Sequence, residues 1–258
     1  MDEQLWTYVR GVMWDYESVP DNVEFVERPA LLMYKTNGSS SFLSNKIAKV
    51  EVETDEAFDQ LIGEVERFYQ GNPYSWWIGP DSKPEDLILK VESAGLEHED
   101  TYYGLVKAVD QWEKVDLPYS IRNVVDEDDV RQYVEVSAYI WGYDDATKKT
   151  LVRQRLEYLK APGRRGGLLV VRDGDRPVGY AGYRFSSDGE AMYLSGTGVL
   201  PEYRGQGIYR ALLSRRMELA SSYGSNWIVT QARKGTSEPI LRKLGFMELG
   251  KYEVYKST

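Results

Sequence analysis

The sequence predicts an α/β (α+β) protein built from two similar domains, and three observations support this prediction. The chain has 258 residues, which fits two domains of about 130 residues better than one. Helix-type and strand-type apolar patterns alternate along it. The two halves also match each other at an offset of 150 residues, where Trp77 aligns with Trp227 and Gly95 with Gly245.

Residues 1–115 form the first expected domain. Apolar residues at helical spacing predict a helix over residues 2–16, which Pro20 ends. β-prone residues predict strands over 23–34 and 47–52, separated by a polar loop over 37–41. Pro84 is tolerated in a first helical turn and Gly95 suits a helix end. The other expected elements are a helix from 55 to near 71, a strand at 76–78, a helix over 84–95 and a strand over 102–109.

Residues 119–258 form the second expected domain, after a polar boundary near 112–119. The acidic run at 126–129 matches the dipole at the start of a helix, and the turn at 173–175 joins two strands. The expected elements are a strand at 121, helices from 126 and over 144–159, strands over 168–172, 177–185 and 192–199, a helix over 206–222, a strand at 227–229, a helix over 236–244 and a strand over 246–255.

Composition excludes several classes of protein. Cysteine is absent, which rules out disulfides, thiolate metal sites and a cysteine nucleophile. No set of His, Asp and Glu residues has metal-ligand spacing, so we expect no metal. No apolar run approaches the ~20 residues of a membrane span, and the first residues are acidic where a secretory signal is basic. We therefore expect a cytoplasmic protein with no membrane partner.

Charge is divided unevenly between the halves. Residues 1–118 contain 24 acidic and 10 basic residues, a net charge of −14, whereas residues 119–258 contain 17 and 22, a net charge of +5. Only the second half suits an anionic ligand. Neither half has the dense Lys/Arg face of a nucleic-acid binder, so we expect no nucleic-acid partner.

One stretch of the second half has the features of an anion-binding turn. An apolar strand ends at Val199, and a turn containing Gly205 and Gly207 leads into a helix. A helix start presents unpaired N–H groups and partial positive charge, which suit a phosphate. The glycines allow close approach of the backbone, and Arg204 and Arg210 add charge. The alternative is a turn whose glycines serve packing alone.

The matching segment of the first half lacks these features. At the offset of 150, residues 204–210 align with residues 54–60, which contain three acids and neither glycine nor arginine. If the halves share a fold, only the second half keeps a nucleotide-type site.

Two motifs carry a resemblance to a known family. Residues 200–207, with Arg204-x-x-Gly207, follow one expected strand, and residues 237–246 follow the next. Together they resemble the acetyl-CoA-binding motifs of the GNAT superfamily of acyl-CoA-dependent N-acetyltransferases, and the order of elements over 119–258 is similar to that fold. The resemblance implies two GNAT-like domains, each a mixed, mostly antiparallel sheet flanked by helices. Residues 1–118 resemble the family only through the repeat and imply a degenerate domain.

The resemblance implies that acetyl-CoA is the co-substrate. Its pantetheine arm would pair with the strand end, and its pyrophosphate would lie on N–H groups of the turn. The expected cofactor-binding residues are Gly198, Val199, Leu200, Arg204, Gly205, Gln206, Gly207, Ile208, Tyr209, Arg210 and Ser237. Ser237 fits a helix cap equally well. A deprotonated amine would attack the thioester directly, with a backbone N–H near Val199 polarising the carbonyl.

Three positions depart from the family pattern. Tyr209 stands where the family has Gly or Ala, Leu241 replaces a tyrosine that acts as general acid, and Tyr193 replaces a glutamate base. The proton-transfer groups therefore stay open: a water chain assisted by Tyr193, Ser195, Tyr252 or Tyr255 is one option, although each tyrosine also fits a packing role.

The expected function is N-acetyl transfer to a primary amine of a small molecule or peptide in a ternary complex. The first domain would cover the substrate cleft or form an interface, a homodimer being one option. The main alternative is a non-catalytic acyl-CoA sensor or scaffold, which Leu241 and Tyr193 favour; a third is a site for another nucleotide. The segment Trp141-Gly142-Tyr143 is either a substrate wall or ordinary packing, and His98 is expected at the surface.

Overall fold

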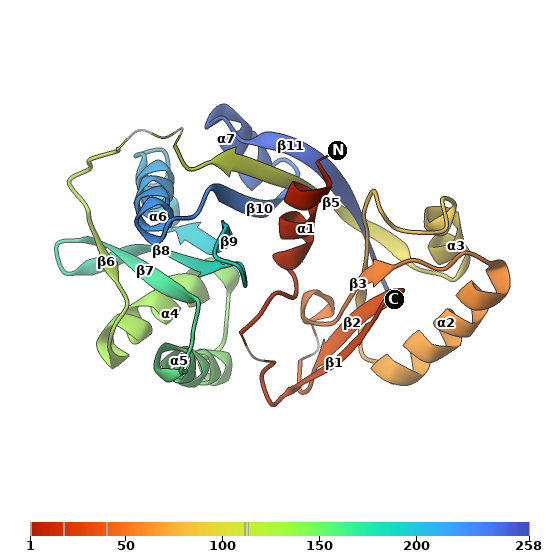
Figure 1. Ribbon diagram of the computed structural model, residues 1–258. Coiled ribbons are helices and arrows are strands. Elements are labelled where there is room, and N and C mark those ends of the chain that lie inside the picture. The colour runs from red at the N-terminus through yellow and green to blue at the C-terminus, as the bar shows by residue number, and fades with distance from the viewer. Residues whose placement is uncertain (1, 18, 40, 111, 113, 258) are drawn as a thin grey trace. The chain divides into compact units, whose positions relative to one another are not determined.

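The computed structural model describes residues 2–17, 19–39, 41–110, 112 and 114–257 (Figure 1). Two units emerge from its contacts: residues 1–105 together with 231–258, and residues 106–230. Ser40, in the expected loop over 37–41, and Glu113, in the expected boundary over 112–119, lie outside the described residues. Each helix in the described ranges is too short or too polar to cross a membrane.

The first unit contains a mixed sheet. Its strands lie in the order β1 (Val23–Arg28), β2 (Leu31–Thr36), β3 (Lys46–Val50), β4 (Ser75–Ile78), β11 (Met247–Lys256) and β5 (Glu97–Ala108). The β3–β4 pair is parallel, whereas the pairs β1–β2, β2–β3 and β4–β11 are antiparallel. The helices of this unit are α1 (Glu3–Gly11), the 3-10 helix η1 (Phe42–Ser44), α2 (Asp55–Tyr69), α3 (Leu87–Ser93) and α7 (Ser237–Lys243).

The helix α2 shows why the sequence forms these elements. Thr54 Oγ1 accepts a hydrogen bond from the Ala57 N–H at 3.1 Å, which caps the helix start. The buried face of α2 packs on the sheet, with the Phe58 ring stacked 6.0 Å from that of Trp76. Capping and the apolar face together place α2 close to its expected bounds.

Two expectations for the N-terminal segment were wrong in detail. The expected strand over 23–34 is two strands, β1 and β2, joined at Pro29-Ala30 and paired from Val23–Thr36 to Arg28–Leu31. Proline fixes its own φ and lacks an N–H, so it suits a tight turn and interrupts a strand. The expected helix over 2–16 ends at Gly11 and continues as turns.

The sheet of the second unit contains β10 (Trp227–Arg233), β9 (Ala191–Val199), β8 (Arg176–Phe185), β7 (Gly166–Asp173) and β6 (Ser120–Asn123), in that order. Residues 231–233 of β10 belong to the first unit, and residues 106–108 of β5 belong to the second. β10 and β9 are parallel, and the other pairs are antiparallel. Figure 1 shows α6 (Ile208–Tyr223) on one face of this sheet and α4 (Glu127–Trp141) and α5 (Asp145–Lys160) on the other. The expected architecture, a mixed and mostly antiparallel sheet flanked by helices, is confirmed.

The repeat is visible in the elements themselves. α3 and α7 begin at Leu87 and Ser237, and β5 and β11 begin at Glu97 and Met247, in each case 150 residues apart. However, α7 and β11 belong to the first unit, because β11 pairs with β4 over Ser75–Ile78. The compact units thus differ from the halves 1–115 and 119–258. These halves follow the repeat, and their identity as two domains stays a prediction.

Candidate functional site

β9 leaves its parallel neighbour, β10, after the first third of its length. Its pairing with β10 covers Ala191, Met192 and Tyr193 only, whereas its pairing with β8 continues to Val199. In the described part of the second unit, no other strand pairs with this side of β9 beyond Tyr193. The last six residues of β9 therefore have an open edge.

A β-bulge lies at the point where this open edge begins. Ala181 of β8 is opposite Thr197 and Gly182 is opposite Ser195, so Gly196 is the extra residue. A bulge bends its strand and increases the local twist. This bend turns the end of β9 away from its neighbour.

The open edge presents the backbone of Val199. The Leu200 N–H donates to the Val178 carbonyl of β8 at 2.9 Å. Because successive residues of a strand direct their N–H and C=O groups to opposite sides, the N–H and C=O of Val199 face away from β8. Of the three expected residues 198–200, Val199 is thus the one that offers its polar groups to a ligand. Its carbonyl already accepts from Arg204 Nε at 3.2 Å.

The turn after β9 leads to an uncapped helix start. Gly205 and Gly207 have φ angles of 76° and 83°, a region that favours glycine. α6 begins at Ile208 with Gly207 as its N-cap, so no side chain accepts from its first N–H groups. A Cβ at Gly205 would meet nothing within 4 Å. The space beside these N–H groups is open, and the helix dipole favours an anion there.

Side chains hold this turn in place. Glu202, in the 3-10 helix η2 (Pro201–Tyr203), pairs with Arg176 at 2.5 Å, and Tyr203 Oη donates to Asp173 at 3.0 Å. Gln206 donates to the Glu202 carbonyl at 3.1 Å and accepts from Tyr119. Hydrogen bonding and the Arg176 charge lower the pKa of Glu202, and the ion pair offsets its negative charge.

Tyr209 lies on the inner side of α6. Its ring is half-buried, and burial raises the pKa of its hydroxyl. The positive charge of Arg216, two turns further along the same helix face, partly offsets this effect. Gly205 borders the open space beside the first N–H groups of α6. Arg204 and Arg210 are exposed at the same end of the helix.

The expected catalytic residues lie in different units. Tyr193 is the last residue of β9 that pairs with β10 and is 2% exposed, with the Arg184 guanidinium 5.2 Å from its ring. Ser195 is exposed on the open part of the strand. Tyr252 belongs to the first unit, where it is buried and stacks on Trp6 at 5.1 Å. Burial raises its pKa well above the usual value, which makes it a poor base.

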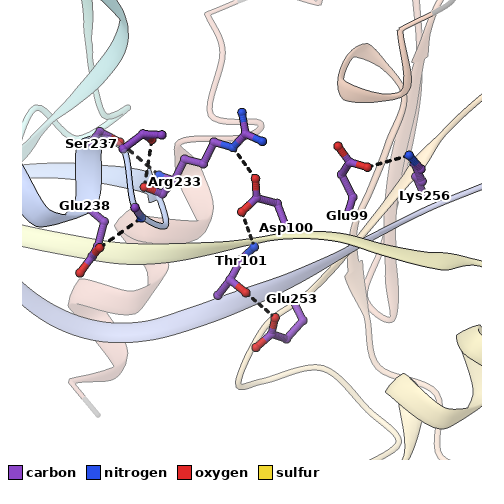
Figure 2. A network of polar contacts seen from close by, with 10 residues as sticks. Glu99, Asp100, Thr101, Arg233, Ser237, Glu238, Glu253 and Lys256 are labelled. Atoms are coloured by element: carbon purple, nitrogen blue, oxygen red, sulfur yellow. Dashed lines mark hydrogen bonds and ion pairs between the residues drawn. The ribbon is translucent and has the colours of Figure 1, made fainter.

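Ser237 also belongs to the first unit. Its Oγ accepts from the Arg233 N–H at 3.1 Å, as Figure 2 shows, and so ties the start of α7 to the end of β10. Arg233 also pairs with Asp100 of β5, and Thr101 donates to Glu253 of β11 at 2.8 Å. Ser237 therefore has a structural role, and its role in cofactor binding stays a prediction.

Sequence reasoning missed an aromatic group on the α4 face of β9. A Cβ at Gly198 would lie 2.5 Å from the Tyr180 ring, and a Cβ at Gly196 would lie 3.9 Å from Tyr133 Oη. The Tyr133 and Tyr180 rings meet edge to face at 4.9 Å, and Trp141 Nε1 donates to Tyr180 Oη at 2.6 Å. Burial raises the pKa of Tyr133 to about 12. The α4 pattern places Tyr133 on a buried face but does not reveal which strand it meets.

Comparisons with known proteins agree with this geometry. Residues 127–246 match the family model described as the acetyltransferase (GNAT) family. A GCN5-related N-acetyltransferase from Kribbella flavida has a TM-score of 0.67 and 16% identity, over 98% of this chain and 94% of that one. A tandem GNAT protein from the clavulanic acid biosynthesis pathway has a TM-score of 0.68 and 11% identity, over 93% and 84%.

A conserved protein of unknown function from Staphylococcus epidermidis ATCC 12228 has a TM-score of 0.69 and 16% identity, over 90% of this chain and 92% of that one. No curated protein sequence matches the chain. At these identities the solved structures show the fold alone. The chain therefore has the GNAT fold, and its residues 127–246, slightly less than half of the chain, match the model of the GNAT acetyltransferase family.

Proposed function

We propose that the second unit binds acetyl-CoA and that the protein transfers the acetyl group to a primary amine of a small molecule or peptide. One observation carries this proposal: the open edge of β9 leads directly into a glycine turn at the uncapped start of α6. Coenzyme A has an extended arm with two amides and a pyrophosphate. A strand edge suits the amides and a helix start suits the pyrophosphate.

The proposed reaction is direct attack by the amine. The neutral amine nitrogen forms a bond to the thioester carbon while the carbon–sulfur bond breaks, the nitrogen loses a proton and the thiolate gains one. The Val199 N–H, which faces the open edge, is the proposed donor to the bound acetyl-CoA. Binding both reactants side by side supplies the rate advantage of proximity, and no covalent enzyme intermediate is needed.

Tyr133 is the proposed proton donor to the leaving thiolate. Its hydroxyl is directed toward the bulge of β9 and makes no hydrogen bond to any described residue. With its pKa raised to about 12 by burial, it holds its proton at neutral pH and is an acid rather than a base. Tyr193 and Ser195, further back on β9, are the proposed assistants of a water chain that removes the proton from the amine.

The end of α4 offers a surface for the acceptor. Tyr139, Trp141 and Tyr143 are 66%, 58% and 40% exposed, and Trp141 is hydrogen-bonded to Tyr180 beside Gly198. Aromatic faces attract cationic groups. This cluster supports a role as the substrate wall for an amine that arrives protonated.

The test places a negative charge where the pyrophosphate is expected. Gly207→Glu should abolish CoA binding in calorimetry and CoA release in the presence of a panel of amines. Gly224→Glu is the matched control, because Gly224 has a φ of 89° and no atom within 4 Å of its Cβ position, at the other end of the same helix. Both variants carry the same backbone strain. Unchanged CoA affinity in a folded Gly207→Glu protein would refute the proposal.

A non-catalytic acyl-CoA sensor is the second candidate. Leu241, which replaces the family's tyrosine, is 1% exposed in α7 and has no proton to give. Tight CoA binding without CoA release for any amine would favour the sensor. Protection from thermal unfolding by ATP or NAD and not by CoA would instead indicate another nucleotide.

A further inference from the structure

A fully buried arginine lies on the inner face of α6. Arg216 is 0% exposed, among apolar residues such as Leu212 and Met217. Its Nε donates to the Leu212 carbonyl at 3.2 Å, and its Nη1 donates to Thr197 Oγ1 at 2.9 Å and to the Gly182 carbonyl at 3.4 Å. Its Nη2 is buried and has no hydrogen-bond partner among the described residues. One face of the guanidinium fork is thus left without an acceptor.

No described carboxylate balances this charge. The groups that interact electrostatically with Arg216 are the hydroxyls of Tyr209 and Tyr133, which are neutral at pH 7. Burial lowers the pKa of Arg216 to about 10, so the side chain is still a cation at neutral pH. A buried cation without a counter-ion is unfavourable. The site as it stands lacks an anion.

The guanidinium lies at the bulge of β9. Its partners Thr197 and Gly182 flank the extra residue Gly196 on the two strands. Tyr133, from the α4 face, has its hydroxyl beside the same residue. At this level β9 has already left β10. Arg216 is therefore held at the bulge of the strand along which the acyl end of the co-substrate is expected.

The pyrophosphate is too far away to be this anion. Arg216 is eight residues beyond Ile208, the first residue of α6, which corresponds to about 12 Å along the helix axis. The Nε of Arg216 is held at the Leu212 carbonyl, in the second turn of α6, and Nη2 is buried, whereas the first N–H groups of α6 lie beside the open space at Gly205. An anion bound to those N–H groups is therefore not the partner of Nη2. The missing acceptor belongs to another part of the bound molecules.

We propose that Arg216 Nη2 binds a carboxylate at the bulge of β9. The carboxylate comes either from the acyl group of a dicarboxylic acyl-CoA or from the amine acceptor. Thr197 Oγ1 accepts from Arg216, so its own proton is directed elsewhere and can be donated to the same carboxylate. This proposal rests on the proposed function and specifies the substrate class of that site.

The first experiment measures acyl-CoA binding. Acetyl-CoA and succinyl-CoA are titrated by calorimetry into the wild type, Arg216→Met and the control Arg215→Met, which removes a half-buried arginine paired with Glu218 on the same helix. If the acyl group carries the carboxylate, the wild type and the control should bind succinyl-CoA about ten- to a hundredfold more tightly than acetyl-CoA. Arg216→Met should lose that preference and keep its acetyl-CoA affinity.

The second experiment varies the acceptor. CoA release from acetyl-CoA is measured with lysine and with cadaverine, which lacks the carboxylate. If the acceptor carries the carboxylate, the wild type should have a KM for lysine about ten- to a hundredfold lower than for cadaverine. Arg216→Met should have similar KM values for the two amines. Arg216→Lys keeps the charge without the planar fork and should retain part of the preference, which tests the proposal should Arg216→Met not fold.

Three outcomes overturn the proposal. Wild-type protein that binds acetyl-CoA but shows neither preference refutes the carboxylate site alone. Wild-type protein that binds no CoA refutes the proposed function, and this proposal with it. A preference that survives Arg216→Met also refutes the role of Arg216.

Discussion

Replacing Arg216 by methionine should make the protein more stable. Burial lowers the pKa of Arg216 to about 10, against an ordinary value of about 12.5. At 1.36 kcal/mol for each pKa unit, holding the cation in the folded chain costs about 3 kcal/mol at pH 7. The substitution also removes the hydrogen bond to Thr197 Oγ1 and the two longer ones to the Leu212 and Gly182 carbonyls, which are together worth about 1 to 2 kcal/mol. The expected net gain in the free energy of unfolding is about 1 to 2 kcal/mol, in line with other buried charges replaced by apolar residues.

Urea unfolding of the wild type and Arg216→Met in the absence of ligand measures this difference. A gain of this size should raise the melting temperature by about 2 to 8 °C in a chain of this length. Arg215→Met, which replaces a half-buried arginine that has a carboxylate partner in Glu218, is the control and should shift stability by less than about 0.5 kcal/mol. A lower urea midpoint for Arg216→Met with an unchanged slope would show that the protein already compensates the charge, and the reasoning would fail.

Three further predictions concern other sites. Tyr133→Phe should lower kcat about a hundredfold with unchanged CoA affinity, whereas Tyr223→Phe, exposed at the far end of α6, should leave kcat unchanged; equal kcat values for Tyr133→Phe and the wild type in CoA-release assays would remove Tyr133 as the acid. Gly198→Ala places a Cβ 2.5 Å from the Tyr180 ring and should lower the free energy of unfolding by about 1 to 3 kcal/mol. Gly196→Ala, whose Cβ would lie 3.6 Å from the same ring, should be tolerated, and equal urea midpoints for the two variants would contradict this prediction. Burial lowers the pKa of Lys46 to about 8 in the folded chain, whereas the pKa of an unfolded lysine is near 10.4. Between these two pH values the unfolded chain binds more protons, so the free energy of unfolding should rise with pH. Lys46→Met should abolish that rise in the urea midpoint, and an unaltered pH slope would show that another group is responsible.

The anion-binding turn could be predicted because it depends on local chemistry. Positive φ angles favour glycine, so Gly205 and Gly207 mark the turn in the sequence itself. The open edge of β9 could not be predicted in the same way. It depends on β10 pairing only as far as Tyr193 and on the bulge at Gly196, and both are properties of the assembled sheet.

The unit to which the C-terminal segment α7–β11 belongs could not be predicted from the sequence either. The repeat makes α3 and α7 equivalent, as it does β5 and β11, but equivalent strands have equivalent apolar patterns. The pattern therefore does not say which sheet a strand joins, and Ser237 and Tyr252 fell in the unit without the turn. Arg216 did leave a signal: it is a charged residue in the apolar stripe of the helix expected over 206–222.

The insertion of β11 beside β4 also sets an order of events during synthesis. The unit of residues 106–230 is complete before the ribosome reaches Met247, whereas the unit that begins the chain must wait for β11. Until then β4 has an unpaired edge, which is prone to pairing with other chains. Domains usually fold from the N-terminus first as they emerge. In this protein the unit of residues 106–230 can fold before the unit that contains β4. Until β11 is made, the latter unit has the greater need of protection from aggregation.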